Sequence, residues 1–362
     1  MAQNSNRAGN YRGLINVVVA RFSALGDVAM SVPVIYSACR CYPDVRFIFV
    51  TRPAMTGIFV NAPENLCLVG ADVRNDYVGA AGIYRLVREL TAEYRPDCFI
   101  DLHDVLRTRL MRIYFKLRGV KTVALNKGRA HKRALTRRHN KVMLPLISSR
   151  ARYREAFFSA GMPLSERFHG GLYGGHGVAP AANFATICDP KPDGAKWIGI
   201  APFAAHTGKI YPVDMMEKVI AQIADECPDA KIFFFGGDGI EQQILTRWAT
   251  ALPDAVSLAG KRYGFPAELA LINHLDVMLT MDSANMHLAS IVSTPTVSVW
   301  GATHPYCGFK GWHTNDDDTV QLPMTCRPCS VFGNKPCHRG DYLCLTAIRP
   351  EMIARKVLEK IQ

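Results

Sequence analysis

The stretch that decides the fold is Leu14–Asp27, LINVVVARFSALGD, near the start of the chain. Its first half, Leu14–Ala20, is a short apolar run typical of a buried strand. A small-residue loop follows, and a helical pattern then continues to about Tyr42. Pro33 interrupts that pattern, which predicts either a kink or a new helix start near Ser31. A strand that passes through a short loop into a helix is the opening unit of an α/β fold.

The same alternation recurs along the chain. Further strands are expected at Arg46–Val50, Asp97–Asp101, Val120–Leu125, Trp197–Pro202, Lys231–Gly236, Asp276–Met281 and Thr296–Trp300. Helices are expected at Tyr84–Tyr94, Val105–Arg118, Val213–Cys227, Ile240–Leu252, Pro266–His274 and Ala284–Val292. In the helix over Val105–Arg118, a stripe of Leu106, Leu110, Ile113 and Leu117 is expected to face the core. This order predicts parallel sheets covered by helices.

The length of 362 residues and one Gly- and Pro-rich stretch, residues 170–196, predict two domains. We expect a flexible N-terminal leader over residues 1–13, without a signal-peptide pattern, and a Rossmann-like domain over residues 14–175. A linker over residues 176–196 would lead to a second Rossmann-like domain over residues 197–362. The predicted fold class is α/β, with two parallel sheets facing a central cleft. Ligands of such sheets bind beyond the carboxyl ends of the strands.

The positive charge is concentrated in one segment. The net charge is +12, yet Val105–Arg154 holds sixteen Lys and Arg residues and no acid, and the remainder has more acids than bases. This distribution indicates an anionic partner: nucleic acid, an anionic membrane surface or a phosphorylated substrate. No apolar run approaches the ~20 residues that a transmembrane helix needs.

Two loops of the predicted first and second domains carry candidate chemistry. Asp27 follows the first strand, where a carboxylate either caps the next helix or acts as a general base towards a hydroxyl. The loop Ala201–Lys209 contains small residues and ends in a lysine, so it either cradles a phosphate or leaves Lys209 solvated.

Two further loops belong to the predicted second domain. Ser283 suits a helix N-cap, Ala284 allows close approach, and the helix N-terminus beside His287 would face a diphosphate. A buried, satisfied histidine is the alternative for His287. Asp282 would repel phosphate, so it is assigned to sugar hydroxyls or to bracing of the loop. In Gly236–Glu241 an acid could accept hydrogen bonds from ribose.

Together these loops resemble glycosyltransferase family 9, the ADP-heptose:lipopolysaccharide heptosyltransferases. The resemblance runs from about Leu14 to Ile361. Its most specific parts are RFSALGDVAMSVPVI and MDSANMHLASIVSTPTVSVWGATHP, with APFAAHTGKIYP and FFFGGDGIEQ between them in the family's order. It implies a GT-B fold and an inverting, metal-independent transfer of heptose from ADP-heptose to a lipopolysaccharide inner-core acceptor. It implies no required cofactor.

The resemblance also implies roles for single residues. Asp27 would be the general base, and the first domain would bind the acceptor. The donor-binding residues would be Thr207, Lys209, Glu241, Asp282, Ser283, Ala284 and His287. Many members have Asp-Thr-Gly where this chain has Asp-Ser-Ala, so the backbone approach at Ala284 is expected to be slightly tighter.

The basic segment acquires a role from the same resemblance. The phosphorylated, lipid-linked saccharide acceptor, or the anionic face of the inner membrane, would contact Arg107, Arg109, Lys127, Arg129, Lys132 and Arg133. The expected location is the cytoplasm, peripheral to that membrane. The alternatives are a transferase for another nucleotide sugar, and a basic nucleic-acid- or membrane-binding protein without catalysis. Against nucleic acid, the segment lacks interleaved aromatics and the usual RNA-binding signatures.

The chain has eleven cysteines, of which seven are scattered and indicate reduced thiols in a cytosolic protein. The other four have the spacing Cys326-x2-Cys329-x7-Cys337-x6-Cys344. Four thiols match a structural zinc site by residue type, but the later spacings are irregular. Reduced or paired thiols are the alternative.

Overall fold

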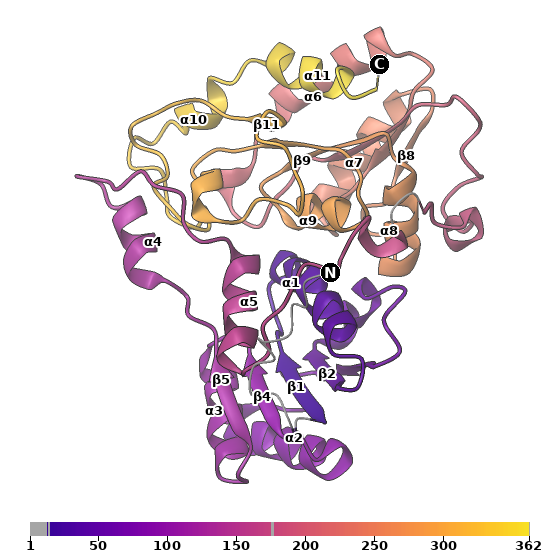
Figure 1. Ribbon diagram of the computed structural model, residues 1–362. Coiled ribbons are helices and arrows are strands. Elements are labelled where there is room, and N and C mark those ends of the chain that lie inside the picture. The colour runs from indigo at the N-terminus through magenta and orange to yellow at the C-terminus, as the bar shows by residue number, and fades with distance from the viewer. Residues whose placement is uncertain (1–12, 14, 175–176, 362) are drawn as a thin grey trace, which may run out of the picture. The chain divides into compact units, whose positions relative to one another are not determined.

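A computed structural model describes residues 13, 15–174 and 177–361 (Figure 1). The chain divides into two compact units. Unit 1 extends to Lys127 and includes Ser149–His169, whereas unit 2 comprises Gly128–Ser148 and the chain from Gly170 onward. Apart from residue 13, the predicted leader lies outside the described residues. Within the described ranges, no helix is both long enough and apolar enough to cross a bilayer.

Unit 1 is built on a five-stranded sheet in the order β3-β2-β1-β4-β5, and every neighbouring pair is parallel. The strands are β1 (Asn16–Ala20), β2 (Arg46–Thr51), β3 (Leu66–Gly70), β4 (Cys98–Asp101) and β5 (Lys121–Ala124). The helices are α1 (Leu25–Cys41), α2 (Gly79–Tyr94), α3 (Leu106–Lys116) and α5 (Ser149–Ser159), with a 3-10 turn η1 (Pro53–Ile58).

Alternation along the strands of unit 1 gives each face of the sheet its own helices. Val18, Ile48 and Phe99 lie in register and pack with Leu86 of α2 and Phe115 of α3. The opposite face carries the side chains that alternate with these along each strand. There the ring of Phe47 lies 6.2 Å from that of Phe157 in α5, and α5 packs against α1. Both faces are therefore buried, as parallel sheets require.

Unit 2 repeats this plan with a six-stranded sheet in the order β11-β10-β9-β6-β7-β8, also parallel throughout. The strands are β6 (Trp197–Ala201), β7 (Lys231–Phe234), β8 (Ala255–Ser257), β9 (Val277–Met281), β10 (Thr296–Val299) and β11 (Thr319–Val320). From Gly170 onward its helices are α6 (Val213–Glu226), α7 (Ile240–Ala251), α8 (Phe265–His274), α9 (Ala284–Ile291), α10 (Leu343–Thr346) and α11 (Pro350–Leu358). Shorter 3-10 turns are η2 (Gly171–Tyr173), η3 (Ala181–Phe184), η4 (Thr207–Lys209) and η5 (Pro305–Cys307).

The structure divides the chain differently from the predicted ranges 14–175, 176–196 and 197–362. Helix α4 (Arg129–Thr136) and the segment after it pack in unit 2, where the Lys132 ammonium lies 5.2 Å and 5.6 Å from the rings of Phe309 and Phe332. Most of the predicted linker also packs there, since the Ala179 N–H donates to the Asn273 amide oxygen at 2.7 Å. Glycine and proline mark turns, and they do not reveal which core a turn packs against.

The predicted strands and helices are confirmed to within a few residues, and so is the α/β class. Helix α1 continues through Pro33 without a second start. One face was predicted wrongly: α3 buries Thr108, Met111 and Phe115, while Leu106 and Leu117 of the expected core stripe are each 77% exposed. The sheet's residues on that side contact the Met111 and Phe115 face, so the helix is rotated away from its leucine stripe.

Candidate active site

The first candidate site lies where β1 and β4 pair side by side in unit 1. The strand order reverses at this pair, since β2 follows on one side of β1 and β5 on the far side of β4. Ligands of open α/β sheets bind at such a reversal, beyond the carboxyl ends of the strands. The loop from Arg21 to Ala24 follows β1 there, and residues 102–105 follow β4.

Asp27 lies in the first turn of α1, where its carboxylate both caps the start of the helix and forms an ion pair. Its carboxylate accepts a hydrogen bond from the backbone N–H of Ala24 at 3.2 Å, which closes the helix start. The same oxygen pairs with the guanidinium of Arg21. The arginine side chain is 9% exposed and the aspartate 22%, so the carboxylate is the member of the pair that water can reach.

Arg21 is held by the groups around it. One guanidinium nitrogen donates to the carbonyl oxygen of Leu102 in the loop after β4, at 2.6 Å. The ring of Tyr153, from α5, lies 5.9 Å from the guanidinium carbon, and its hydroxyl donates to the backbone oxygen of Asp27 at 3.4 Å. These contacts fix the position of the cation and, through it, that of the Asp27 carboxylate.

The loop after β4 supplies further polar groups. Asp101 is fully buried and accepts the backbone N–H groups of His103 and Asp104 at 2.8 Å each. His103 is 7% exposed, and its Nε2 lies 3.4 Å from the Ser23 hydroxyl. Burial, with the nearby cations Arg21 and Lys127, lowers the pKa of His103 to about 3. The imidazole is therefore neutral at physiological pH.

The second candidate site lies at the matching reversal in unit 2, where β6 and β9 pair. Lys209 follows β6 in η4, and its ammonium lies 2.8 Å from the Asp282 carboxylate, which follows β9. The Thr303 hydroxyl donates to the same carboxylate oxygen at 2.7 Å. Asp282 therefore joins the loop after β6 to the loop after β10. Lys209 is not a solvated surface lysine, because its side chain is 14% exposed and paired.

The loop of Lys209 also depends on close backbone packing. A Cβ at Gly208 would lie 2.9 Å from the Cβ of Ala302 and 3.0 Å from the carbonyl oxygen of Gly333. The Ala302 N–H donates to the Gly208 carbonyl oxygen at 2.8 Å. Glycine at position 208 therefore lets the loop after β6 and the loop after β10 share a tight contact beside Lys209.

The turn from β9 into α9 has the predicted form. Ser283 is the N-cap residue, but its hydroxyl lies 3.0 Å from that of Thr280 and makes no capping bond. Ser283 and Ala284 are part-exposed, so the helix N-terminus is accessible. His287 lies one turn in and is only 5% exposed, which fits the buried alternative better than a donor open to solvent.

Glu241 and Thr207 flank this region. Glu241 is in the first turn of α7, the helix that follows β7, and β7 is the neighbour of β6 in the sheet. Its carboxylate accepts a hydrogen bond from the Gly237 N–H at 2.7 Å. It therefore orders the Gly236–Glu241 loop. Thr207 is exposed. Because β7, β6 and β9 are adjacent and parallel, Glu241, Lys209 and Asp282 all emerge at the same edge of the sheet.

The six basic residues predicted to bind an acceptor are divided between the two units. Arg107, Arg109 and Lys127 belong to unit 1, where Arg109 pairs with Asp104 at 2.9 Å and Lys127 donates to the Asp104 carbonyl oxygen at 2.9 Å. Arg129, Lys132 and Arg133 are on α4 of unit 2. The boundary between the units falls between residues 127 and 128.

The four C-terminal cysteines are free thiols, as are the other seven. Burial, opposed in part by Arg327 and aided by Cys329, Cys326 and Cys337, raises the pKa of Cys344 to about 11. In the described part of the chain, no group of three or more His, Cys, Asp or Glu side chains is arranged to hold a metal ion. The structural zinc stays a prediction, which the zinc content of protein purified without added metal would test.

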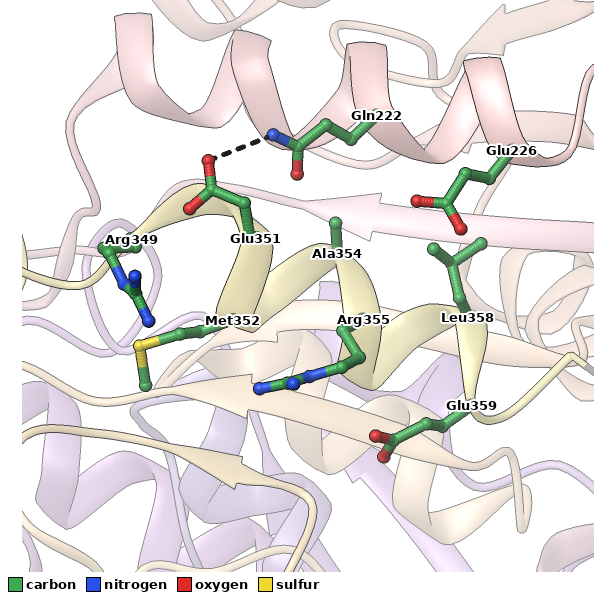
Figure 2. A pocket seen from close by; sticks show the side chains of 9 residues that line it. All are labelled: Gln222, Glu226, Arg349, Glu351, Met352, Ala354, Arg355, Leu358 and Glu359. Carbon is green, nitrogen blue, oxygen red and sulfur yellow. Dashed lines mark hydrogen bonds between the residues drawn. The ribbon is translucent and has the colours of Figure 1, made fainter.

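A separate hollow of about 380 Å³ lies between α6 and α11 of unit 2 (Figure 2). Gln222 and Glu351 are joined across it by a hydrogen bond of 3.3 Å. Acidic and basic side chains both line it, including Glu226 and Arg355. None of the candidate site residues takes part, so this hollow is not the predicted site.

Several residues of the two sites were not predicted from the sequence. Arg21 and Asp101 were within quoted stretches, yet neither was given a role. A charged residue directly at the end of a buried strand is a usable signal, because it cannot stay buried without a partner. His103, Tyr153 and Thr303 carried no such signal, since their positions depend on loops and helices remote in the sequence.

The chain is similar to known glycosyltransferases. The sequence model of Glycosyltransferase family 9 (heptosyltransferase) matches residues 83–336. Lipopolysaccharide heptosyltransferase 1 of Pseudomonas aeruginosa is 21% identical over 366 residues, covering 95% of this chain and 97% of that protein.

Two solved structures show the likeness of fold. The family 9 glycosyl transferase from Veillonella parvula has a TM-score of 0.71 at 16% identity, over 96% of this chain and 97% of that one. The E. coli heptosyltransferase WaaC with ADP has a TM-score of 0.64 at 16% identity, over 96% and 100%. The predicted GT-B fold class is confirmed by these matches.

Proposed function

Because the chain belongs to glycosyltransferase family 9, the heptosyltransferase family, we propose that it transfers heptose from ADP-heptose to a lipopolysaccharide inner-core acceptor. The family makes it a glycosyltransferase. The heptose and the acceptor follow the names of relatives such as the Pseudomonas protein. The adenine nucleotide follows the E. coli enzyme, which was solved with ADP.

One observation carries the assignment of roles. Each reversal of strand order holds an ion pair, and the acid is the more exposed partner in unit 1 whereas the base is the more exposed partner in unit 2. In Arg21–Asp27 the carboxylate is the more exposed partner, at 22% against 9%. In Lys209–Asp282 the ammonium is the more exposed partner, at 14% against 3%. Unit 1 thus offers a proton acceptor, and unit 2 offers a cation.

The proposed reaction is a single displacement with inversion. Asp27 takes the proton of the acceptor hydroxyl as that oxygen forms a bond to the anomeric carbon. The bond from the anomeric carbon to the diphosphate oxygen breaks, and the electron pair leaves with ADP. Lys209 and the N-terminus of α9 meet the charge that develops on the diphosphate, which is the preorganised stabilisation that such a step needs. No metal ion is required in this scheme.

The remaining predicted residues take supporting roles. Thr207 and the ordered Glu241 loop would contact the nucleotide, while Ser283 and Ala284 allow phosphate oxygens to approach the N-terminus of α9. Asp282 positions Lys209, and the buried His287 is assigned to packing within unit 2. Arg107 is close enough to His103 to help lower its pKa, so it adds positive charge beside Asp27 where a phosphorylated acceptor would bind. We place the reaction in the cytoplasm.

The test is a donor screen followed by thermal unfolding. ADP-, GDP- and UDP-sugars are added to the full chain, and a ligand at a hundred times its Kd should stabilise by about 2.7 kcal/mol. ADP-heptose should give the largest shift, with product formed from a deacylated inner-core acceptor in the presence of a chelator. A larger shift with a UDP- or GDP-sugar would replace the donor assignment, and activity lost with the chelator would contradict the metal-free scheme.

A further inference from the structure

Helix α3 carries an unexpected apolar stripe on its outer side. Leu106, Ile113 and Leu117 are 77%, 52% and 77% exposed, and Leu110 lies partly buried between them. The four recur at intervals of four, three and four residues, so they align along one face of the helix. At 1.5 Å per residue the stripe is about 16 Å long. Folding of unit 1 therefore leaves a complete helical face of large apolar side chains uncovered.

The stripe is not needed to hold α3 in place. The inward face of the helix buries Met111 and Phe115 fully in the core beneath β4, with the Phe115 ring 4.8 Å from that of Phe99. A surface helix normally has one apolar face and one polar face. An aligned apolar face beyond the one that packs marks an interaction surface, whereas scattered single residues would not.

Cations border the stripe on both sides. With 3.6 residues per turn, Arg109 and Lys116 fall along one border, and Arg107 and Arg118 fall along the other. The Arg118 guanidinium carbon lies 4.9 Å from the ring of Tyr84, which is 44% exposed on the neighbouring helix α2. Leucines flanked by basic side chains, with a tyrosine at the margin, are the composition of helices that lie in a membrane interface.

We propose that α3 docks unit 1 onto an anionic membrane surface, with Leu106, Ile113 and Leu117 inserted among the acyl chains and the basic borders at the headgroups. Charge favours this occupant, because residues 105–127, which are the part of the basic segment that continues through α3 in unit 1, contain no acid, and the adjoining Asp104 is already paired with Arg109 and Arg112. The helix begins directly after the loop that carries His103 and Asp104. Docking would therefore bring the Asp27 edge of unit 1 to the level of a lipid-linked acceptor, and only this last point rests on the proposed function.

The experiment measures co-sedimentation of the full chain with acceptor-free vesicles. The vesicles contain phosphatidylethanolamine with phosphatidylglycerol, or phosphatidylcholine alone. The test variant is Leu106→Ser/Leu117→Ser, and the control is Ile15→Ser/Val178→Ser, which removes two side chains that are 64% and 63% exposed elsewhere. Burying one leucine is worth about 1.5–3 kcal/mol, so the test variant should bind at least about tenfold more weakly and the control unchanged.

A second pair of variants separates charge from insertion. Lys116→Glu should weaken binding to the anionic vesicles at low salt only, while Lys261→Glu, at an exposed lysine in unit 2, should not. Equal vesicle binding by the wild type and the double serine variant would overturn the proposal. So would equal binding to both lipid mixtures, or self-association or RNA binding that the serine substitutions abolish.

Donor-induced thermal stabilisation is measured on the same preparations. A serine variant that is still stabilised by the donor but no longer binds vesicles supports docking as a separate property of α3. Normal vesicle binding by a wild type that responds to no nucleotide sugar would refute the proposed function and leave the docking surface intact.

Discussion

The β1/β4 edge of unit 1 and the β6/β9 edge of unit 2 are built alike and differ in which charge they expose. Each places a basic residue after one strand and an acid near it, and each joins them as an ion pair. In unit 1 a buried arginine holds a reachable carboxylate, whereas in unit 2 a buried aspartate holds a reachable ammonium. The same α/β plan thus presents a proton acceptor at one edge and an anion receptor at the other.

The difference shows how a buried partner determines the role of an exposed one. A charge removed from water needs a counter-charge, so each buried ion fixes its partner at one place. Arg21 is further tied to Leu102, and Asp282 to Thr303. The exposed member is therefore preorganised before any substrate arrives, which electrostatic catalysis requires.

The largest expected effect is at the exposed carboxylate. Asp27→Asn keeps the size of the side chain but removes the proton acceptor, so turnover should fall by about 10²–10⁴-fold. ADP-induced stabilisation should persist, because the donor site belongs to unit 2. The matched control is Asp44→Asn, at an exposed aspartate of unit 1. Near-normal kcat in Asp27→Asn would refute the base assignment and with it the contrast between the two edges.

A smaller loss is expected at the exposed ammonium. Lys209→Met should weaken ADP binding by about 10- to 100-fold, because a contact with a charged group contributes about 1.5–3 kcal/mol. Isothermal titration with ADP measures this, with Lys261→Met as the control. The same substitution leaves Asp282 without its cation, so the double variant Lys209→Met/Asp282→Asn should regain stability without regaining affinity. A Lys209→Met protein that binds ADP normally but loses acceptor affinity would contradict the role.

The two edges should also differ in pH dependence. Because the folded pKa of His103 is about 3, below the ordinary value of 6.5, the unfolded chain binds more protons between those limits. The stabilising effect of a neutral His103 is complete above about pH 6.5 and is lost as pH falls, with a slope approaching about 1.4 kcal/mol per pH unit. His103→Asn should flatten the pH dependence of the urea midpoint for unfolding.

His304 in unit 2 provides the comparison for that measurement. Burial, with the charge of Arg327, lowers the pKa of His304 to about 4. The pH range over which its protonation changes stability is therefore narrower than that of His103. His304→Asn should therefore change the pH slope less than His103→Asn does. Equal slopes in the wild type and both variants would show that neither imidazole is held neutral by the fold.

The smallest expected effect is at the second partner of Asp282. Thr303→Val removes one hydrogen bond to that carboxylate and should lower stability by about 1 kcal/mol. Thermal unfolding measures the shift, and Thr56→Val, at a threonine whose hydroxyl bonds locally within η1, serves as the control. Because Lys209 would lose part of its bracing, ADP affinity should fall slightly. An unchanged melting temperature would show that Lys209 alone holds Asp282.

Much of the fold could be predicted because the strands are buried on both faces and read as apolar runs. The strands Asn16–Ala20, Val277–Met281 and Thr296–Val299 fall inside their predicted ranges. Strand β8 was missed because Ala255–Ser257 is short and only part-buried. The face of α3 was mistaken because periodicity identifies an apolar stripe but not whether protein covers it.

The sites were predictable to the level of the loop. Asp27, Lys209 and Asp282 could be selected because each follows a strand, and parallel strands bring their carboxyl ends to one edge. The residues that hold them could not be predicted. Arg21, Thr303 and Tyr153 make their contacts only after strands and helices from distant parts of the chain have packed. The run of sixteen basic residues did not reveal that its members are divided between two units, because charge density carries no information about which core a segment joins.

By itself the sequence determined the two α/β sheets and the loops that carry the chemistry, because hydrophobic period and strand-end position are local properties. Only the tertiary structure decided which ion of each pair faces water, which core the segment 128–148 joins, and which side of α3 is left bare. Those outcomes depend on burial, and burial is a property of the packed chain as a whole.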